Sequence, residues 1–304
     1  MDSKKTLSER DICTKYITPA LQKAGWDVES QILEEVSFTD GKIFVRGKLT
    51  ARGKRKRADY ILYYRSNPVA IIEAKDNNHS INAGIQQALD YAKILDIPCV
   101  FSSNGDGFLF HDRTVSDSSI EIELSLDQFP SPENLWNRFK IFKGIQTGEQ
   151  ERIVSQEYYS DPSGRKPRYF QEVAINRSIE SIAKGENRIL LVMATGTGKT
   201  YTAFQIVYRL WKAKVKKRIL FLADRNVLIS QAKNNDFRHF GDKMTWVRNR
   251  QVDKSYEIYL ALYQGISGNE EEANIYKQFS FWLLKLMLKL GDMGLFQMNW
   301  KGQL

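Results

Sequence analysis

The sequence has few cysteines and no long apolar segment, and both absences restrict its class. Cys13 and Cys99 are the only cysteines and form no metal-type pair, which indicates a reducing cytoplasm. The first residues, MDSKKTLSERD, carry charges where a signal peptide needs an apolar core. The longest apolar stretch, FSFWLLKLMLKL at 279–290, is too short to span a membrane and contains two lysines. We therefore expect a cytoplasmic protein without a membrane partner.

Length and charge give two further bounds. A chain of 304 residues has room for two ordinary domains, and a hydrophobic content of 42% is enough to form their cores. The chain contains 45 basic and 36 acidic residues, which gives a formal net charge of +9. This excess favours a polyanionic partner, although a lysine-rich solvated surface would give the same count.

Residues 1–150 have the pattern of a small α/β domain. Apolar residues recur at helical spacing over residues 6–25, and Gly25 can end that helix. A β-hairpin is predicted next, from KIFVRGKLT, a basic turn ARGKRKRA and DYILYY. After Pro68, VAIIEAK predicts a strand buried on both faces, and INAGIQQALDYAKIL predicts a second helix. The last segment, PCVFSSNGDGFLFHD, predicts two strands joined by a glycine turn.

A charged segment with Pro and Gly, residues 151–168, is typical of a connector. A second α/β domain is predicted over residues 169–304. It begins with a helix from Tyr169, followed by the strand RILLVMA, a glycine loop, a helix from Lys199 and the strand KRILFLAD.

The strand VAIIEAK ends in a pattern that suits a metal-dependent nuclease. Side chains alternate along a strand, so Glu73 and Lys75 share a face. Asp59 lies 14 residues upstream, where a neighbouring strand can bring it beside Glu73. Two carboxylates suit Mg²⁺, which could polarise a phosphate and lower the pKa of a water, while Lys75 neutralises charge on the phosphate. A surface ion pair at a strand end is the alternative, because E-x-K is common.

Two polar residues on the next helix, Gln87 and Tyr91, are four apart and face the same way. Together with Asp59, Glu73 and Lys75 they resemble the PD-(D/E)xK nuclease core with the Q-x-x-x-Y element of type I restriction subunits. The resemblance implies that Asp59 and Glu73 are metal ligands, that Lys75 is catalytic, and that Gln87 and Tyr91 support cleavage. Ala58 stands where the motif has proline.

A basic run, RGKRKR at 52–57, precedes Asp59. Next to a phosphodiester-cleaving site, its five positive charges predict contacts to the DNA backbone, although a solvated turn would have the same composition. The residues expected to bind DNA are Arg52, Lys54, Arg55, Lys56 and Arg57.

The segment RILLVMATGTGKT, residues 188–200, predicts a strand, a phosphate-binding loop and a helix. Met193 stands at the first glycine position of the strict P-loop pattern, and ATGTGKT instead resembles motif I of superfamily 2 helicases. Lys199 is expected to contact the β- and γ-phosphates of ATP and Thr200 to bind Mg²⁺. The remaining loop residues expected at the nucleotide are Thr195, Gly196, Thr197 and Gly198.

Three weaker resemblances flank this loop. PRYFQEVAINR resembles the Q-motif, which implies that Gln171 contacts the adenine edge and that Tyr169 or Phe170 packs on the base. ILFLADRNVLISQA resembles motif Ia, and IYLALYQGI resembles the motif after it. In this order, behind a nuclease domain, they resemble the restriction subunit of type I restriction–modification enzymes over roughly residues 1–280.

The resemblance stops where the family has the Asp-Glu pair of motif II. After NIYKQFS the only acidic residue is Asp292. Two interpretations stay open for residues 281–304: a truncated or frameshifted end, or a diverged helix. We expect ATP binding by these 304 residues, with hydrolysis and DNA translocation near background.

The predicted fold class is α/β, with a PD-(D/E)xK restriction-endonuclease-like domain followed by a partial RecA-like (P-loop) domain. The resemblance implies Mg²⁺-dependent cleavage of double-stranded DNA, coupled in the intact enzyme to ATP-driven translocation, with methylation and specificity subunits as partners. The alternatives are an inert DNA- and nucleotide-binding fragment and a repair helicase-nuclease.

Overall fold

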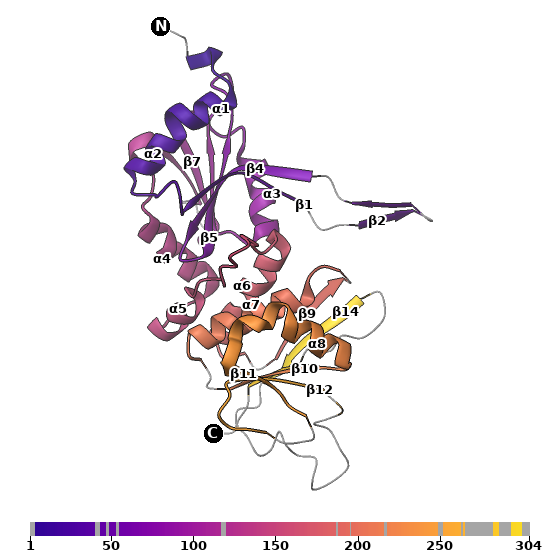
Figure 1. Cartoon of the computed structure of the whole chain (residues 1–304). Coiled ribbons are helices and arrows are strands. Elements are labelled where there is room, and N and C mark those ends of the chain that lie inside the picture. The colour runs from indigo at the N-terminus through magenta and orange to yellow at the C-terminus, as the bar shows by residue number, and fades with distance from the viewer. Residues whose placement is uncertain are drawn as a thin grey trace. The chain divides into compact units, whose positions relative to one another are not determined.

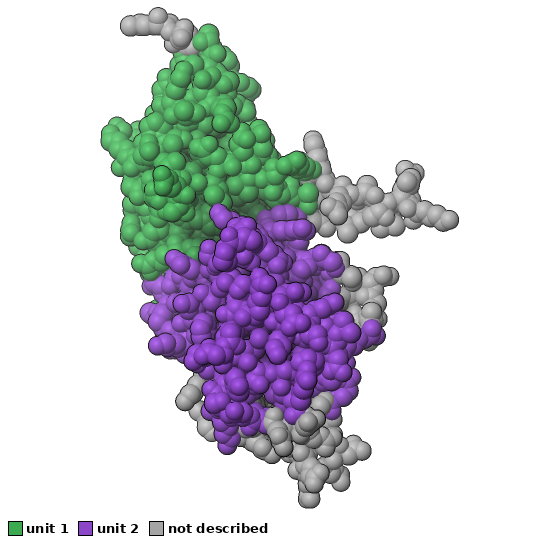
Figure 2. Space-filling view, in the orientation of Figure 1, with its two compact units in different colours: residues 1–147 green, residues 148–304 purple. Residues whose placement is uncertain are grey.

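The computed structural model describes residues 4–39, 43–46, 49–52, 55–116, 120–186, 188–194, 196–215, 218–248, 252–262, 264, 282–285 and 293–299, with the backbone alone at 43–46, 49–52, 188, 282–285 and 293–299. The chain forms two compact units, residues 1–147 and 148–304 (Figure 2). The segment predicted as a connector, residues 151–168, lies within the second unit. Over the described residues, no helix is long and apolar enough to cross a membrane.

The first unit is built on a six-stranded sheet in the order β1-β4-β5-β6-β7-β8. Its strands pair antiparallel except β5 and β6, which are parallel and joined by helix α3 (Ile85–Leu95). The strand bounds are Ile32–Thr39 for β1, Arg55–Tyr64 for β4, Asn67–Ala74 for β5, Cys99–Ser103 for β6, Gly107–Asp112 for β7 and Glu121–Ser125 for β8. Figure 1 shows α3 on the opposite side of these strands from α2 and α4.

Strand β5 is buried at every residue, which confirms the prediction of a strand covered on both faces. Helix α3 and helix α4 (Pro132–Lys143) both pack against β5 and β6. The α4 contribution includes Trp136 and Phe139, whose rings stack at 4.9 Å. The strand that carries Glu73 therefore lies in the middle of the core, which fixes its backbone.

The amino-terminal segment is helical, as predicted for residues 6–25, but not uniformly so. A 3-10 turn, η1 (Lys4–Thr6), precedes α1 (Glu9–Ile12), a π-helical turn η2 (Cys13–Ile17) and α2 (Thr18–Lys23). Ile12, Ile17 and Leu21 are fully buried. The segment ends at Gly25, whose φ of 93° is the left-handed conformation that glycine adopts most easily.

Three expectations for this unit were wrong. The basic segment predicted as a turn contributes residues 55–58 to β4, where they pair with β1 up to Thr39↔Arg55. Pro68 does not precede β5 but is its second residue, and the turn is formed by Arg65 and Ser66, both at positive φ. Strand β1 was not predicted. The predicted hairpin between KIFVRGKLT and DYILYY does not form, because β2 (Ile43–Arg46) and β3 (Leu49–Arg52) pair with each other, whereas β4 pairs with β1 and β5.

The second unit has a six-stranded sheet in the order β11-β12-β10-β13-β14-β9. Strands β10 to β13 pair in parallel, whereas β14 is antiparallel to β13 and β9. The bounds are Arg188–Ala194 for β9, Ile219–Ala223 for β10, Met244–Trp246 for β11, Ile258–Leu262 for β12, Trp282–Lys285 for β13 and Met293–Asn299 for β14. The last two are strands, so the interpretation of residues 281–304 as a diverged helix was wrong for those residues.

The predicted helices after Tyr169 and Lys199 are confirmed as α6 (Tyr169–Ala183) and α7 (Lys199–Lys212). Another short helix, α5 (Gly148–Val154), opens the unit and packs on α6. Helix α8 (Asn226–Asn234) follows β10, and η4 (Asp236–Lys243) follows α8. The loop between β9 and α7, residues 195–198, is the segment that the sequence predicted to bind phosphate, and it is called the phosphate loop.

Candidate nuclease centre and nucleotide-binding loop

Strands β4 and β5 bring Asp59 and Glu73 together. Their antiparallel register runs to Tyr60↔Ile72, so Asp59 and Glu73 are the next residues along the two strands. The Ala74 backbone N–H donates to Asp59 Oδ2 at 2.8 Å, which fixes the Asp59 carboxylate at the end of β5. The strand register thus places Asp59 beside Glu73 on the neighbouring strand.

Glu73 is only 3% exposed, and one of its carboxylate oxygens accepts hydrogen bonds from two side chains. Lys75 Nζ donates to Glu73 Oε1 at 3.0 Å, and Gln87 Nε2 donates to the same oxygen. The other oxygen, Oε2, is buried without a hydrogen-bond partner. A buried carboxylate oxygen in that state carries a desolvation cost that a cation can remove.

The start of helix α3 comes unusually close to Glu73 because residue 84 is glycine. A Cβ at Gly84 would lie 2.9 Å from both Glu73 Cγ and Ser102 Oγ, which no side chain tolerates without movement. The Gly84 N–H donates to Ser102 Oγ at 3.0 Å. Gly84 thus allows the helix to place Gln87 against Glu73.

Burial and mutual repulsion set the electrostatics of the pair. Burial, followed by the Asp59 charge, raises the pKa of Glu73 from 4.5 to about 7. Burial also raises the pKa of Asp59, against the Ala74 hydrogen bond. Burial lowers the pKa of Lys75, but the neighbouring carboxylates, Glu73 first, outweigh it, so the net pKa of Lys75 is raised. The centre therefore favours a bound cation or a proton on Glu73.

Gln87 and Tyr91 form a chain of contacts behind Glu73. Burial raises the pKa of Tyr91, whose hydroxyl is hydrogen-bonded to the Gln87 side chain and the Arg57 backbone. The Tyr91 ring meets Phe38 edge-on at 5.0 Å. Tyr91 is only 8% exposed, so its ring lies in the core rather than in solvent. The chain runs from strand β4 through Tyr91 and Gln87 to the Glu73 carboxylate.

The donor set fits a small divalent cation. Asp59 and Glu73 provide oxygens on adjacent strands, and Mg²⁺ commonly uses one or two protein carboxylates together with waters and substrate phosphate. Among the residues that the structure describes, no three His, Cys, Asp or Glu side chains come together to hold a metal. Two carboxylates alone are a donor set for a cation that keeps much of its own water.

The basic residues before Asp59 are only partly described. Arg55 donates to Ser37 Oγ at 3.0 Å, and Arg57 lies 3.7 Å from Glu35 Oε1. Lys56 Nζ lies 5.6 Å from the centre of the Tyr91 ring, which links the basic strand to the support behind Glu73. The side chains of Arg52 and Lys54 lie outside the described residues.

The phosphate loop has the backbone geometry that the sequence predicted. Gly196 and Gly198 adopt φ values of 78° and 84°, and α7 begins directly after them at Lys199. Thr197 Oγ1 donates to the Ala194 carbonyl at 2.6 Å, and Thr200 is half-buried in the first turn of α7. Thr195 lies outside the described residues.

The side chains expected at the nucleotide contact the protein itself. Lys199 Nζ donates to the carbonyls of Ala194 at 3.0 Å and Met193 at 3.3 Å, and burial lowers its pKa. Gln171 Nε2 donates to the Thr197 carbonyl at 2.8 Å. A Cβ at Gly198 would lie 2.3 Å from Gln171 Nε2, the end of a flexible side chain, and the φ of 84° at Gly198 independently favours glycine. Gln171 therefore contacts the loop backbone here.

Sequence reasoning missed three residues around the nuclease centre. Gly84 and Ser102 shape the approach of α3, and the glycine inside the segment predicted as a helix, INAGIQQALDYAKIL, was the available signal for the first. Glu9 Oε1 lies 3.7 Å from Lys75 Nζ. Nothing local in the sequence points to Glu9, because 66 positions separate it from Lys75.

Comparisons with known families match the two halves separately. The family described as "Type III restriction enzyme, res subunit" matches residues 165–284. The family described as "Type I restriction enzyme EcoKI endonuclease subunit second domain" matches residues 37–97, the segment that contains Asp59, Glu73, Lys75, Gln87 and Tyr91.

Individual relatives extend over most of the chain. The chain is 55% identical over 274 residues to the type I restriction enzyme EcoAI endonuclease subunit of Escherichia coli, covering 90% of this chain and 34% of the relative. It is 28% identical to the type I restriction enzyme EcoKI endonuclease subunit of Escherichia coli K12, covering 75% of this chain and 24% of that relative. The chain thus spans about a third or less of these relatives.

A solved structure agrees with these relatives. It is a fragment described as an HsdR subunit of a type I restriction enzyme from Vibrio vulnificus YJ016. The identity is 40% and the TM-score 0.71, over 90% of this chain and 49% of that one.

Proposed function

We propose, from the premise that this chain is a homologue of the endonuclease subunits of type I restriction enzymes, that it provides the DNA-cutting centre and the ATP-binding loop of such an enzyme. The first unit would hydrolyse a phosphodiester bond of double-stranded DNA with Mg²⁺. The second would bind ATP, which in the complete enzyme drives DNA translocation. The chain spans 34% of the EcoAI subunit, so the activity proposed is that of a longer assembly to which these residues contribute.

The buried Glu73 oxygen without a partner supports the nuclease assignment most strongly. A surface ion pair at a strand end, the simplest alternative, would leave both groups in water. Glu73 is instead buried, is held through one oxygen by Lys75 and Gln87, and has its second oxygen without a hydrogen bond. Such an arrangement costs stability unless a ligand completes it, so it is typical of a functional site.

Each residue of the centre would have a separate role in hydrolysis. A divalent cation bound by Asp59 and Glu73 would supply Lewis-acid stabilisation of the phosphate and a more acidic water. Lys75 would hold its ammonium group where negative charge develops on the phosphate oxygens. Gln87 would orient the Glu73 carboxylate, and Tyr91 would fix Gln87, so both act through Glu73.

Contacts to the DNA backbone would come from the start of β4. Arg55, Lys56 and Arg57 precede Asp59 on the same strand, and we assign Arg52 and Lys54 to the same group from the sequence. Contacts to phosphates fix position without reading bases. Recognition of a DNA sequence would therefore belong to specificity and methylation subunits, which we propose as the protein partners.

The loop between β9 and α7 would bind ATP with its Mg²⁺. Its residues would be Gly196, Thr197, Gly198, Lys199 and Thr200, with Thr195 included from the sequence. Lys199 now donates to two strand carbonyls and would exchange them for phosphate oxygens. Gln171, which donates to the Thr197 carbonyl, would contact the edge of the adenine base. We propose the cytoplasm as the compartment, since Cys13 and Cys99 are both free thiols.

Nicking of supercoiled plasmid DNA tests the nuclease assignment. We expect the 304-residue chain to convert the plasmid to nicked product with Mg²⁺ and not with EDTA. Glu73→Ala should abolish the product, whereas Asp127→Asn, which removes one charge from an exposed ion pair with Lys23, should leave it unchanged. Equal nicking by Glu73→Ala and the unsubstituted chain would refute the assignment and favour an inert DNA-binding fragment.

A further inference from the structure

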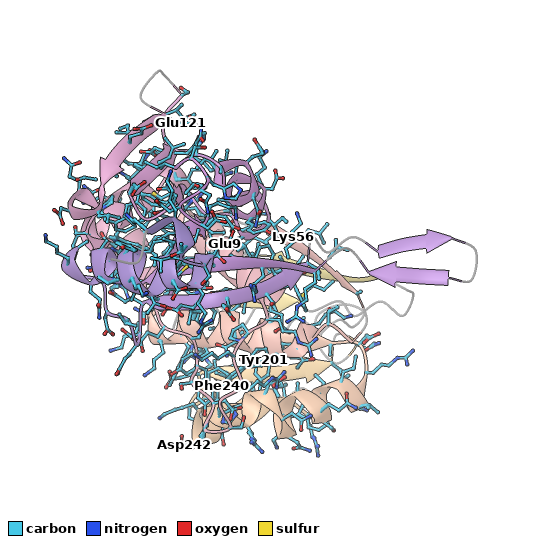
Figure 3. All side chains as sticks on the ribbon, turned by 90° about the horizontal axis from the view of Figure 1, so that it is seen from above. Glu9, Lys56, Glu121, Tyr201, Phe240 and Asp242 are labelled. Carbon is cyan, nitrogen blue, oxygen red and sulfur yellow. The ribbon has the colours of Figure 1, made fainter. Side chains whose placement is uncertain are left out.

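Glu9 is an acidic residue at the nuclease centre that none of the motifs includes. It is the first residue of α1, and Figure 3 labels it on the first unit. Its Oε1 lies 3.7 Å from Lys75 Nζ, an ion-pair distance. Glu9 therefore gives Lys75 a second carboxylate besides Glu73.

The surroundings of Lys75 show why a second carboxylate matters. Lys75 Nζ donates to Glu73 Oε1 at 3.0 Å and to the Ala74 carbonyl at 2.9 Å. Under the proposed function Glu73 also binds a divalent cation, which neutralises its charge and repels the ammonium group. Glu73 is then a weaker anionic partner of Lys75, although its Oε1 stays within reach of the ammonium group. Glu9 is the carboxylate that stays available.

The position of Glu9 is fixed by contacts on both sides of it in the chain. Ser8 caps α1 with a reciprocal pair of hydrogen bonds to Asp11. Before the helix, Lys4 Nζ donates to the Gly105 carbonyl at 2.5 Å and pairs with Asp106 Oδ1 at 2.7 Å. The amino-terminal segment is therefore attached to the turn between β6 and β7.

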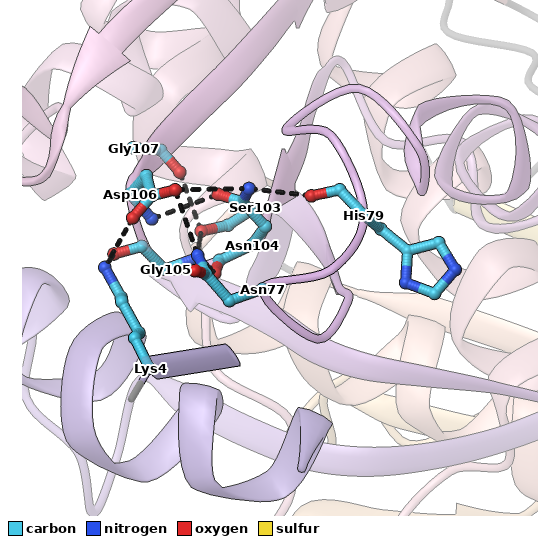
Figure 4. A network of polar contacts seen from close by, with 8 residues as sticks. All are labelled: Lys4, Asn77, His79, Ser103, Asn104, Gly105, Asp106 and Gly107. Atoms are coloured by element: carbon cyan, nitrogen blue, oxygen red, sulfur yellow. Dashed lines mark hydrogen bonds and ion pairs between the residues drawn. The ribbon is translucent and has the colours of Figure 1, made fainter. Parts of the chain in front are cut away.

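The same turn also holds the loop that follows Lys75. Figure 4 shows the network. Asn77 Nδ2 donates to the Asn104 carbonyl at 3.0 Å and to Asp106 Oδ2 at 2.9 Å, and Asn104 Nδ2 donates to the His79 carbonyl at 2.8 Å. Because one turn anchors both the segment before Glu9 and the loop after Lys75, it sets the distance between these two side chains.

A role as a third metal ligand fits the geometry less well. Over the described residues, no group of three acidic, His or Cys side chains could hold a metal, so Glu9 does not converge with Asp59 and Glu73 on one point. The short contact of Glu9 is with the ammonium group of Lys75. The geometry thus favours action through the lysine.

We propose that Glu9 is a positioning residue of the nuclease centre, which holds the Lys75 ammonium group in place while the Glu73 carboxylate binds a divalent cation. This inference rests on the proposed nuclease function. It assigns the amino-terminal segment a part in catalysis: the segment carries Glu9 to the centre and keeps it there through the Lys4 and Asp106 contacts.

Side-chain NMR of the Lys75 ammonium group separates this role from a structural one. The full 304-residue chain is labelled at lysine, the Lys75 signal is identified by its loss in Lys75→Arg, and its mobility is measured with and without saturating Mg²⁺. In the unsubstituted chain the group should stay ordered in both states. In Glu9→Gln it should be ordered without Mg²⁺, where Glu73 holds it, and mobile with Mg²⁺. Glu9→Asp should fall between, and Asp127→Asn should match the unsubstituted chain.

Cleavage provides the second readout. At saturating Mg²⁺, Glu9→Gln should lower the single-turnover nicking rate by about tenfold to a hundredfold, as expected for a misplaced catalytic group. The Mg²⁺ midpoint, which is the Mg²⁺ concentration that gives half of the maximal rate, should stay nearly unchanged. A midpoint shift that excess Mg²⁺ reverses would make Glu9 a ligand and overturn the proposal. So would a Lys75 group that is ordered in both states of Glu9→Gln, or mobile in both.

Failure of the nuclease assignment itself has a different signature. If Mg²⁺ changes no signal near Glu73 in the unsubstituted chain, the metal centre is wrong and the role of Glu9 falls with it. If Mg²⁺ binds and cleavage depends on Glu73 while Glu9→Gln behaves like the unsubstituted chain, only the proposal for Glu9 is wrong.

Discussion

The nuclease centre and the phosphate loop differ in what their functional side chains contact. In the first unit Glu73 has a buried oxygen without a hydrogen bond and a pKa raised to about 7 by burial and Asp59. In the second unit Lys199 and Gln171 are both bonded to backbone carbonyls of β9 and its loop. The first site therefore has a buried acceptor without a partner, whereas the side chains of the second are satisfied by internal hydrogen bonds.

This difference separates the expected responses of the two sites. A cation entering the nuclease centre competes with a proton and satisfies an oxygen that has no other partner. A nucleotide entering the loop must exchange existing hydrogen bonds for its own, so part of its binding energy is offset. Metal binding should therefore depend on pH through Glu73, and nucleotide binding should depend mainly on Lys199.

The largest effect should come from Glu73→Gln, which keeps the shape of the side chain and removes its charge. Mn²⁺ binding to the nucleotide-free chain, followed by electron paramagnetic resonance, should weaken by at least about a hundredfold, since loss of a ligand exceeds the loss of a supporting residue. Nucleotide affinity should not change. A parallel loss at both sites would show that the substitution disturbs the whole chain, and the comparison would fail.

The reciprocal substitution is Lys199→Ala. It removes the cation that we expect to meet the ATP phosphates, and nucleotide affinity measured by calorimetry should fall by about tenfold to a hundredfold, the range of a charged hydrogen bond. Mn²⁺ binding at the nuclease centre should stay the same. Unchanged ATP affinity would mean that the Lys199 contacts to Ala194 and Met193 persist in the complex.

Gly84→Ala tests the close approach of α3 to the nuclease centre. The added Cβ would meet Glu73 Cγ and Ser102 Oγ at 2.9 Å, so the free energy of unfolding should fall by about 1–3 kcal/mol, the usual cost of overpacking. Gly148→Ala is the matched control, because nothing lies within 4 Å of its Cβ position. Equal denaturation midpoints for the two variants would contradict the packing.

The smallest graded effect is the pH dependence of metal binding. Below the Glu73 pKa of about 7 the proton competes with the cation, so Mn²⁺ affinity should fall by about tenfold for each pH unit and level off above it. Because this folded-state pKa exceeds the ordinary 4.5, Glu73 stabilises the metal-free protein fully below about 4.5 and loses this contribution as pH rises through 7. Glu73→Gln should remove both trends.

Local patterns allowed much of this to be predicted. The apolar run of β5, the helix that carries Gln87 and the loop before Lys199 each have a signal within about ten neighbouring residues. Strand β1 was missed because Glu34, Glu35 and Ser37 interrupt its apolar pattern, and its pairing with β4 forms it. The basic start of β4 was mistaken for a turn because its strand conformation likewise depends on pairing with β1 and not on a local apolar pattern.

The parts of the centre that could not be predicted depend on distant contacts. Glu9 reaches Lys75 because the turn at Asn104 and Asp106 binds the amino-terminal segment and the loop after Lys75 together. That arrangement joins three segments far apart in the sequence. Likewise, the unpaired Glu73 oxygen is a property of packing that no spacing of residues reveals.

A crystal of the chain soaked in Mn²⁺ and measured at the manganese absorption edge tests the central claim most directly. We predict an anomalous peak at coordination distance, about 2.0–2.3 Å, from Glu73 Oε2 and an Asp59 oxygen, with Lys75 facing the site. The same crystal of Glu73→Gln should lack the peak. A peak elsewhere with none at Glu73, or an Asp59 carboxylate turned away from Glu73, would contradict the account.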